Sequence, residues 1–177
     1  MNAQPLPRTS FDLAQYQRRV REGPCFVCAL VAGDPDYQHH IVYQDGDTIA
    51  FLSRYPTLLG YCLVAPKAHL EDWVHDMKPD EFLRFQAVTH VIARAIAAAV
   101  PTERTYSLSL GSKQGNAHLH WHLAPLPPDV PHHQQQFHAL MGENGVLAVT
   151  DAGQAALAQR IRNQLPRDHV GGSADRR

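Results

Sequence analysis

Three histidines at alternate positions, His118, His120 and His122, are the residues of this sequence best suited to do chemistry. Successive side chains of a β-strand point to opposite faces, so an extended segment would present these imidazoles on one face, with neighbouring rings about 6.7 Å apart. Leu119 and Trp121 would face the other way and belong to the core. A neutral imidazole, with a pKa of about 6.5, is a nucleophile at neutral pH, and a neighbouring ring can orient it and stabilise charge on a bound phosphate. The row therefore indicates nucleophilic catalysis on a phosphate group.

The same row has two other interpretations. Alternate histidines on a strand also bind zinc or iron, which would make the protein a metalloprotein that holds a catalytic ion on all three rings. The iron version includes a carboxylate, and no Asp or Glu lies between Arg104 and Pro128. The third interpretation is an exposed strand face that happens to contain histidine. It is disfavoured because exposed strand positions more often carry residues such as threonine.

Cys25 and Cys28 form a second group, spaced as half of a zinc motif. The other ligands of such a site would come from distant parts of the chain, and two buried core thiols are the alternative. A thioredoxin-like redox role is disfavoured, because a charged helical segment ending at Gly23-Pro24 stands where that motif expects a strand. The sequence alone leaves the choice between zinc ligands and core thiols open.

Charge, hydropathy and cysteine content exclude several classes of protein. Lys and Arg number 16 against 17 Asp and Glu, a formal charge of -1, which argues against bulk nucleic-acid binding. Hydrophobic residues make up 44% of the chain, enough for a core, but no apolar run reaches the ~18 residues of a membrane span. Residues 1–10 lack the features of a secretory signal, and three cysteines are too few for a disulfide scaffold. We therefore expect a cytoplasmic protein.

The elements that position these residues predict an α+β fold. Apolar or alternating runs predict five strands, at residues 41–43, 48–52, 61–65, 106–110 and 118–123. An Asp-Gly step joins the first two strands and predicts a hairpin. From Pro79 to Val100 apolar residues recur every three or four positions, which predicts one long helix. Three strands, a helix and two strands predict a mainly antiparallel sheet of about five strands.

We expect the chain to divide into an N-terminal arm with a short helix (1–24), a central domain (25–128) and a C-terminal extension (129–177). The short helix should begin near Phe11, with Thr9 or Ser10 as its cap. In the extension we expect a short helix at 134–141 and a second helix, capped by Asp151, that runs to about Leu165. A disordered tail should follow at 171–177.

The row and its surroundings resemble the histidine triad (HIT) family. His-Leu-His-Trp-His-Leu-Ala at 118–124 fits the His-x-His-x-His-x-x signature of that family, in which x is apolar. The resemblance also includes Cys25-x-x-Cys28, the hairpin ending in Ala50-Phe51, Pro56-x-x-x-Gly60-x-x-Leu63-Val64-x-Pro66-Lys67-x-His69, the long helix and Gln114. It covers about residues 25–125 and implies a HIT-like fold for the central domain.

The resemblance implies a nucleotide hydrolase or transferase, with dinucleoside polyphosphates among its candidate substrates. His120 would attack the α-phosphorus and form a covalent nucleotidyl-histidine, which water or another acceptor such as phosphate would then cleave. His122 would hydrogen-bond to phosphate oxygens, and His118 would complete the triad. Gln114 and the backbone amides from Ser112 to Asn116 would bind the phosphate.

Several positions depart from the family pattern. Ser53 stands where many members have an Asp or Asn that binds ribose, and its single hydroxyl offers a weaker contact. Gly60-Tyr61 replaces a frequent Gly-His, and Pro125-Leu126 replaces a frequent Pro-Arg. Ser109 occupies the place of a polar residue often found where the strand meets the phosphate loop. These departures leave the nucleobase and leaving group undefined, and they keep open a nucleotide-binding protein with little turnover.

Two further properties follow from the resemblance alone. Some relatives bind structural zinc at positions that correspond to Cys25, Cys28, His69 and His118, and all four ligand types are present here. Relatives also pair through the long helix and the adjoining strand, which forms a ten-stranded sheet in a homodimer. We therefore expect a structural zinc ion and a homodimer.

Overall fold

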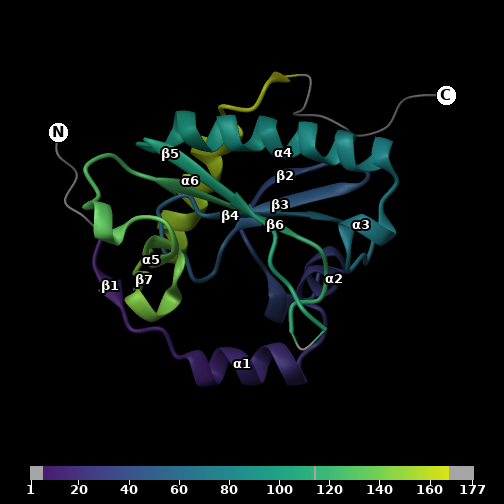
Figure 1. The fold of residues 1–177 in the computed structure, drawn as a ribbon, viewed down its shortest axis with the longest axis horizontal. Coiled ribbons are helices and arrows are strands. Elements are labelled where there is room, and N and C mark those ends of the chain that lie inside the picture. Colours follow the sequence, from purple (N-terminus) through teal and green to yellow (C-terminus); the bar gives the residue numbers. More distant parts are fainter. Residues whose placement is uncertain (1–5, 114, 168–177) are drawn as a thin grey trace.

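The computed structural model describes residues 6–113 and 115–167, and its centre is a five-stranded sheet (Figure 1). The strands, in their order across the sheet, are β2 (Ile41–Gln44), β3 (Thr48–Leu52), β4 (Cys62–Pro66), β6 (Trp121–Leu126) and β5 (Arg104–Leu108). Every neighbouring pair is antiparallel. The predicted α+β class, with five antiparallel strands and one long helix, is confirmed.

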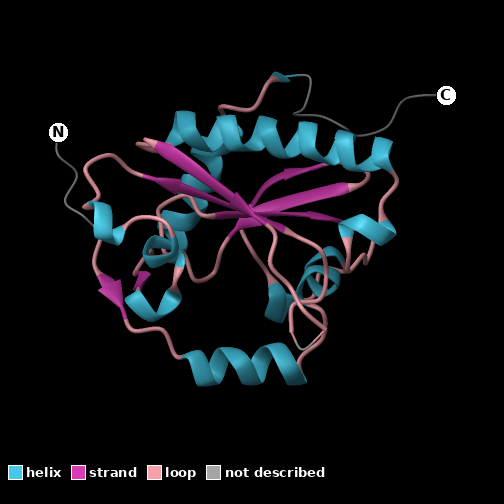
Figure 2. Cartoon of the chain, in the orientation of Figure 1, coloured by secondary structure: helices cyan, strands magenta, loops and turns pink. Residues whose placement is uncertain are grey.

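Two helices, α4 (Pro79–Ala99) and α6 (Asp151–Arg162), cover one face of this sheet (Figures 1 and 2). Proline in the first turn suits the start of α4, and the Glu81 carboxylate accepts a hydrogen bond of 2.9 Å from the Lys78 backbone amide just before it. The residues that pack between the helices and the sheet include Val64, Ile92, Ile96, Trp121, Leu157 and Ile161. This layer is the larger part of the core.

The opposite face of the sheet is covered by shorter elements. They are α1 (Leu13–Glu22), α2 (Phe26–Val31), α5 (Phe137–Leu140) and a small sheet of β1 (Arg8–Thr9) and β7 (Val146–Leu147). A second apolar cluster, which contains Val27, Leu30, Phe51, Leu63 and Ala139, lies on this side. The other short elements are α3 (Trp73–Asp76) and the 3-10 helices Pro35–Tyr37, His132–Gln134 and Gly142–Asn144. In Figure 1, α1 lies on the far side of the sheet from α4.

Two predicted strands are displaced by a few residues, because contacts with distant segments of the chain set where each strand begins and ends. The last strand begins at Trp121 rather than at residue 118, because the preceding segment leaves the ladder and the Leu119 amide donates to the Leu70 carbonyl instead. Its partner β5 begins at Arg104 and ends at Leu108, since Leu108 pairs with His122. The histidine row therefore enters the sheet only at its last member.

The predicted helix caps are also wrong. Asp12 caps α1 by accepting a hydrogen bond of 2.8 Å from the Gln15 amide, because Thr9 is held in β1 opposite Val146. Thr150 rather than Asp151 caps α6. At α1, the pairing of the preceding segment with β7 therefore decides which side chain can reach the first turn of the helix.

The C-terminal part of the described chain packs onto the sheet. His40 Nε2 lies 2.8 Å from the Asp151 carboxylate, and α6 contributes Leu157 and Ile161 to the core. The expected helix at 134–141 is shorter, because α5 spans only Phe137–Leu140, and the expected tail at 171–177 lies outside the described residues. No helix of the described part is long and apolar enough to cross a bilayer.

Candidate functional site

The histidine row lies beside the second apolar cluster, on the face of the sheet away from α4. His122, inside β6, pairs directly with Leu63 of that cluster. Leu119 and Trp121 are buried under α4, as the predicted alternation requires. The prediction that the leucine and tryptophan face the core is confirmed. The backbone therefore directs the imidazoles to the other side.

The backbone fixes the tautomer of His120. Its Nδ1 lies 2.6 Å from the carbonyl oxygen of His118, and because a carbonyl can only accept, Nδ1 carries the ring hydrogen. The Ser109 hydroxyl donates to the carbonyl of His120 at 2.8 Å, and the Phe26 ring lies edge-on with its centroid 5.4 Å from the imidazole. The lone pair of His120 is thereby placed on Nε2, the atom that can attack an electrophile.

Burial keeps the catalytic candidates neutral. The side chain of His120 is enclosed, and this burial lowers its pKa despite the hydrogen bond to the carbonyl of His118. Burial, together with the nearby His120, lowers the pKa of His122 to about 3. The two ring centroids are 4.7 Å apart. At neutral pH His120 and His122 are therefore uncharged, and an uncharged imidazole retains the lone pair that a nucleophile needs.

Tyr61 is a partner of the row that the sequence did not single out for this role. Its hydroxyl lies 3.1 Å from Nδ1 of His122, and the two rings meet edge-on with centroids 5.8 Å apart. Gly60, with a φ of 88°, makes the turn that delivers Tyr61 to the sheet, and burial raises the tyrosine's pKa to about 12. The only sequence signal for this contact is the replacement of the family's frequent Gly-His by Gly60-Tyr61.

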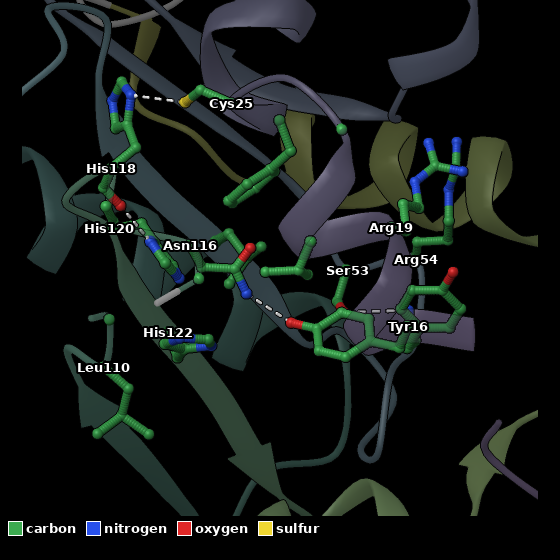
Figure 3. Close-up of a pocket in the computed structure, with 18 of the residues that line it drawn as sticks. Tyr16, Arg19, Cys25, Ser53, Arg54, Leu110, Asn116, His118, His120 and His122 are labelled. Carbon is green, nitrogen blue, oxygen red and sulfur yellow. Dashed lines mark hydrogen bonds between the residues drawn. The ribbon is translucent and has the colours of Figure 1, made fainter. Parts of the chain in front are cut away.

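A cavity of about 830 Å³ opens over His120 and His122 (Figure 3). Of the residues predicted to bind substrate, Ser53, Ser112 and Asn116 line it. Ser109 instead borders a neighbouring cavity of about 520 Å³, because its hydroxyl is directed to the backbone of His120. Gln114 lies outside the described residues. The structure therefore gathers three predicted binding residues around one space and separates Ser109 from it.

The N-terminal helix α1 forms part of the cavity wall, which the sequence did not reveal. Asn116 donates a hydrogen bond of 2.6 Å to the hydroxyl of Tyr16, as Figure 3 shows. Val20 of α1 also packs against the loop that contains Gly115. The contact is so close that a Cβ added to Gly115 would lie 2.5 Å from Val20 Cγ1. Asn116 itself adopts a left-handed conformation, with a φ of 52°. In the sequence, only the amphipathic pattern of α1 indicated that one face of this helix would be buried. That pattern does not indicate which residues the face covers.

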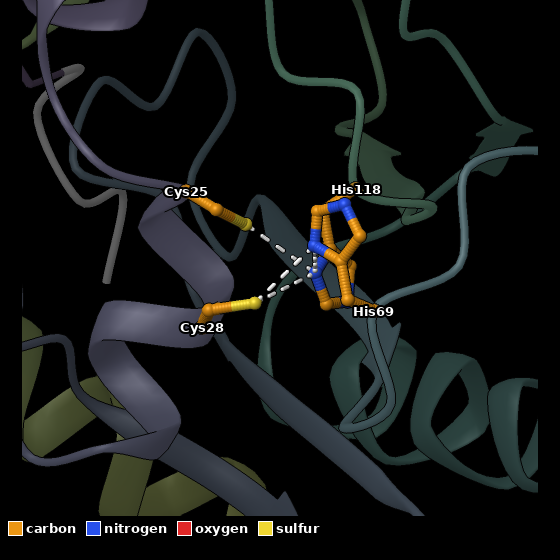
Figure 4. A group of neighbouring side chains, drawn as sticks. All are labelled: Cys25, Cys28, His69 and His118. Carbon is orange, nitrogen blue, oxygen red and sulfur yellow. Dashed lines mark hydrogen bonds between the residues drawn. The ribbon is translucent and has the colours of Figure 1, made fainter.

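The predicted metal ligands converge into one cluster (Figure 4). The ligand atoms of Cys25, Cys28, His69 and His118 all lie within 4.8 Å of one another. The Cys25 sulfur is 3.4 Å from Nδ1 of His118, the Cys28 sulfur is 3.3 Å from Nδ1 of His69, and the two Nδ1 atoms are 3.2 Å apart. Four soft and borderline donors at these separations suit a tetrahedral ion such as zinc. The cluster could hold a metal ion.

The surroundings of the cluster orient its histidines toward the centre. Nε2 of His118 lies 2.8 Å from the carbonyl oxygen of Pro66, so it donates and leaves Nδ1 with a lone pair for an ion. Burial raises the pKa of Cys25, but the hydrogen bonds from His118 and Cys28 outweigh burial and lower it to about 6. A thiolate is the form of cysteine that binds metal. Burial and the neighbouring Cys25 raise the pKa of Cys28 to about 11, so only one thiol of the pair is poised to lose its proton before an ion binds.

The same geometry separates His118 from the other two members of the row. Nδ1 of His118 faces the cysteines and Nε2 faces Pro66, so neither nitrogen faces a substrate in the cavity. Among the described residues, the one group of ionisable side chains close enough to share an ion contains His118 but neither His120 nor His122. His118 acts on the next member of the row through its carbonyl oxygen, which orients the ring of His120.

Comparison with known sequences identifies relatives of the central part of the chain. An uncharacterized HIT-like protein of Mycobacterium tuberculosis is 33% identical over 106 residues, which are 59% of this chain and 72% of that protein. The protein named hit of Bacillus subtilis is 30% identical over 105 residues, which are 58% of this chain and 70% of that protein.

Solved structures share the fold. A hypothetical histidine triad nucleotide-binding protein from Sulfolobus tokodaii aligns with a TM-score of 0.64 and 23% identity, covering 79% of this chain and 91% of that one. A zinc-bound histidine triad family protein from Mycobacterium smegmatis aligns with a TM-score of 0.60 and 23% identity over the same shares. The HIT domain profile matches residues 34–128, more than half of the sequence. Together with the row of alternate histidines and the observed sheet, this match shows that the chain belongs to the HIT domain family.

Proposed function

We propose that this protein is a nucleotide hydrolase or transferase that forms a covalent nucleotidyl-histidine at His120. The observation that carries the proposal is the 2.6 Å contact between Nδ1 of His120 and the carbonyl of His118, which leaves the lone pair on Nε2. The position of His120 beside a cavity large enough for a nucleotide supports it. HIT family membership supplies the class of reaction, and a nucleoside phosphate derivative is the proposed substrate.

In the first step Nε2 of His120 attacks the α-phosphorus. A phosphorus–nitrogen bond forms, and the bond from phosphorus to the leaving oxygen breaks, so the leaving group departs with that electron pair. The neutral His122 donates a hydrogen bond from its Nε2 to a phosphate oxygen, since its Nδ1 is occupied by Tyr61. Ser112 and Asn116 line the cavity and would lie near the same phosphate. The amides of Ser112 and Gly115, which the resemblance implied as phosphate donors, instead donate to each other's carbonyl oxygens at 3.2 and 3.0 Å.

In the second step an acceptor oxygen attacks the same phosphorus. The bond to His120 breaks, its electron pair returns to Nε2, and the proton lost by the acceptor passes to solvent. When water is the acceptor the product is a nucleoside monophosphate. When inorganic phosphate is the acceptor, the product is a nucleoside diphosphate. The cavity is open to either acceptor, so both belong to the proposal.

We also propose that Cys25, Cys28, His69 and His118 hold a structural zinc ion. The donor set, the mutual distances and the carbonyl behind His118 support zinc, and a relative of the same fold is zinc-bound. When bound, the ion would link α2 to the segment that leads into β6. The four residues themselves would fix the start of that segment and therefore the carbonyl that orients His120.

A homodimer is the proposed assembly. β5 is an edge strand that pairs only with β6 in the described part of the chain, and α4 exposes Leu83, with 66% of its surface accessible. Pairing of two β5 edges would join two sheets and cover α4. The mass of the protein in solution, measured by light scattering, would be twice the chain mass of 19.7 kDa. A mass of a single chain would contradict this assembly.

The proposed reaction is tested by trapping its intermediate. The protein is mixed with a radiolabelled adenosine or guanosine 5′-phosphate ester, quenched within one turnover and digested, and mass spectrometry locates the adduct. We expect the nucleotidyl group on His120, and no adduct or turnover in His120→Ala. The control, His90→Ala, removes an exposed imidazole of α4 and should retain both. Turnover that survives in His120→Ala would overturn the mechanism, whereas binding without any adduct in the unaltered protein would indicate a nucleotide-binding protein.

A further inference from the structure

Two arginines lie side by side at the end of the cavity remote from His118 (Figure 3). Arg19 comes from α1 and Arg54 from the loop after β3. Both guanidinium groups donate to the same acceptor, the carbonyl oxygen of Asp36, at 2.7 Å and 3.3 Å. A shared acceptor places the two positive charges close together. The steps proposed at His120 assign no function to this part of the cavity wall.

Among the described residues, the two charges have no anionic partner. Within residues 6–113 and 115–167, neither guanidinium has a carboxylate oxygen within 4.0 Å, since the ion pairs found there involve other residues. The carbonyl groups that hold Arg19 and Arg54 orient them without neutralising them. A guanidinium has five N–H donors in a planar fork, so each group retains donors beyond these contacts.

The field of this pair reaches a neighbouring side chain. The pKa of His39, which also lines the cavity, is lowered to about 4, first by burial and further by the charges of Arg54 and Arg19. A positive potential therefore extends over this end of the cavity, which would favour an anionic group there.

The rest of this end is aromatic and comes partly from α1. Phe11, Tyr16 and Tyr55 form a cluster with ring centroids 5.2 to 5.8 Å apart, and all three line the cavity. Phe11, Tyr16 and Arg19 lie outside residues 34–128, the region that matches the HIT domain. The cavity therefore has one end made by the HIT signature and another end completed by a segment outside the domain match.

We propose that Arg19 and Arg54 form a second anion subsite, which binds a phosphate group of the substrate other than the one attacked by His120. The proposal rests on the proposed nucleotidyl transfer and narrows its substrate to nucleotides with at least two phosphate groups. Arginine forks are suited to phosphate because they make two parallel, charge-assisted hydrogen bonds. The second phosphate could belong to the 5′ chain or to the 2′ or 3′ hydroxyl of the ribose, and the shared chemistry is a phosphate held between two guanidinium groups.

The subsite is tested by calorimetric titration of the full chain with adenosine 5′-monophosphate, adenosine 5′-diphosphate, and the 2′,5′- and 3′,5′-bisphosphates, and with their guanosine counterparts. We expect at least one doubly phosphorylated nucleotide to bind about tenfold or more tightly than its monophosphate. In Arg54→Gln and Arg19→Gln this ratio should fall toward one. Arg18→Gln is the matched control, because Arg18 is an exposed arginine of the same helix that does not line the cavity.

Each outcome of the titration decides the proposal. A preference for the diphosphate identifies the 5′ chain as the source, and a preference for a bisphosphate identifies the ribose. Absence of any preference, absence of nucleotide binding, or a preference that survives in Arg54→Gln would overturn the subsite. The adduct at His120 is measured separately on the same protein. Failure of the covalent mechanism would appear as a missing adduct. The titration would still measure how much Arg19 and Arg54 contribute to nucleotide binding.

Discussion

The hydroxyl oxygen of Tyr61 lies 3.1 Å from Nδ1 of His122, with the two ring planes at 90°. Burial raises the pKa of the tyrosine to about 12, so its hydroxyl keeps its proton at neutral pH and can donate. Burial also keeps His122 neutral, and a neutral ring that accepts at Nδ1 carries its hydrogen on Nε2. Tyr61 therefore orients the donor that the proposed reaction uses.

The role of Tyr61 predicts a specific kinetic defect. Tyr61→Phe keeps the ring and removes the hydroxyl, so His122 can rotate or change tautomer. We expect kcat to fall by roughly tenfold, the effect of losing about one hydrogen bond, while KM changes little. Tyr61→His, whose ring N–H can replace the hydroxyl as the donor to His122, should recover part of kcat. Tyr106→Phe removes a hydroxyl outside the cavity and should leave kcat unchanged; an equal fall in both Phe variants would contradict the positioning role.

Metal removal should destabilise the protein and release zinc. Ligand binding to the native state alone adds to the free energy of unfolding, so a chelator should lower the thermal midpoint. Elemental analysis should find one zinc ion per chain in the unaltered protein and none in Cys25→Ser or Cys28→Ser.

Two variants distinguish a structural zinc ion at the cysteine pair from a catalytic ion on the histidine row. Cys62→Ala removes a thiol that is fully buried in the core and should retain the ion. His120→Ala should also retain it, because His120 lies outside the ligand cluster. Loss of zinc in His120→Ala would show that the histidine row itself holds the ion.

Acid should weaken the fold partly through His39. Its pKa is lowered from 6.5 to about 4, chiefly by burial, so the unfolded chain binds a proton in this interval that the folded protein does not. The contribution of this residue is therefore fully present above about pH 6.5 and is lost as the pH falls toward 4. We expect His39→Gln to show a shallower decrease in the free energy of unfolding between these values in urea titrations. An identical pH dependence in both proteins would contradict this origin.

Truncation of α6 side chains should destabilise the whole domain, since the helix completes the core. Ile161 is fully buried against the sheet and α4, so Ile161→Ala should lower the free energy of unfolding by about 2–5 kcal/mol. Arg160→Ala, an exposed change on the same helix, should alter it by less than about 0.5 kcal/mol. Urea unfolding monitored by tryptophan fluorescence measures both. A small effect at Ile161 would mean that α6 is a separable appendage.

Short-range patterns in the sequence determined most of the sheet, the long helix and the face of the histidine row. Alternation at 118–123 predicts the buried positions of Leu119 and Trp121, because strand geometry repeats every two residues. An Asp-Gly step predicts the hairpin, and a repeat of three and four predicts α4. These features depend on residues a few positions apart, which is why they are readable without a structure.

Tertiary structure alone decided which atoms meet. The Cys25 sulfur and Nδ1 of His118 come together across 93 residues, and no local rule gives that distance. The helix cap moved to Asp12 because β1 pairs with a strand near the other end of the chain. The placement of α1 against the loop at Asn116, which brings Arg19 into the cavity wall, likewise depends on packing between distant segments. The sequence therefore specified the proposed nucleophile, His120, and the folded chain specified the tautomer of that residue, the separate cluster of cysteines and histidines and the far end of the cavity.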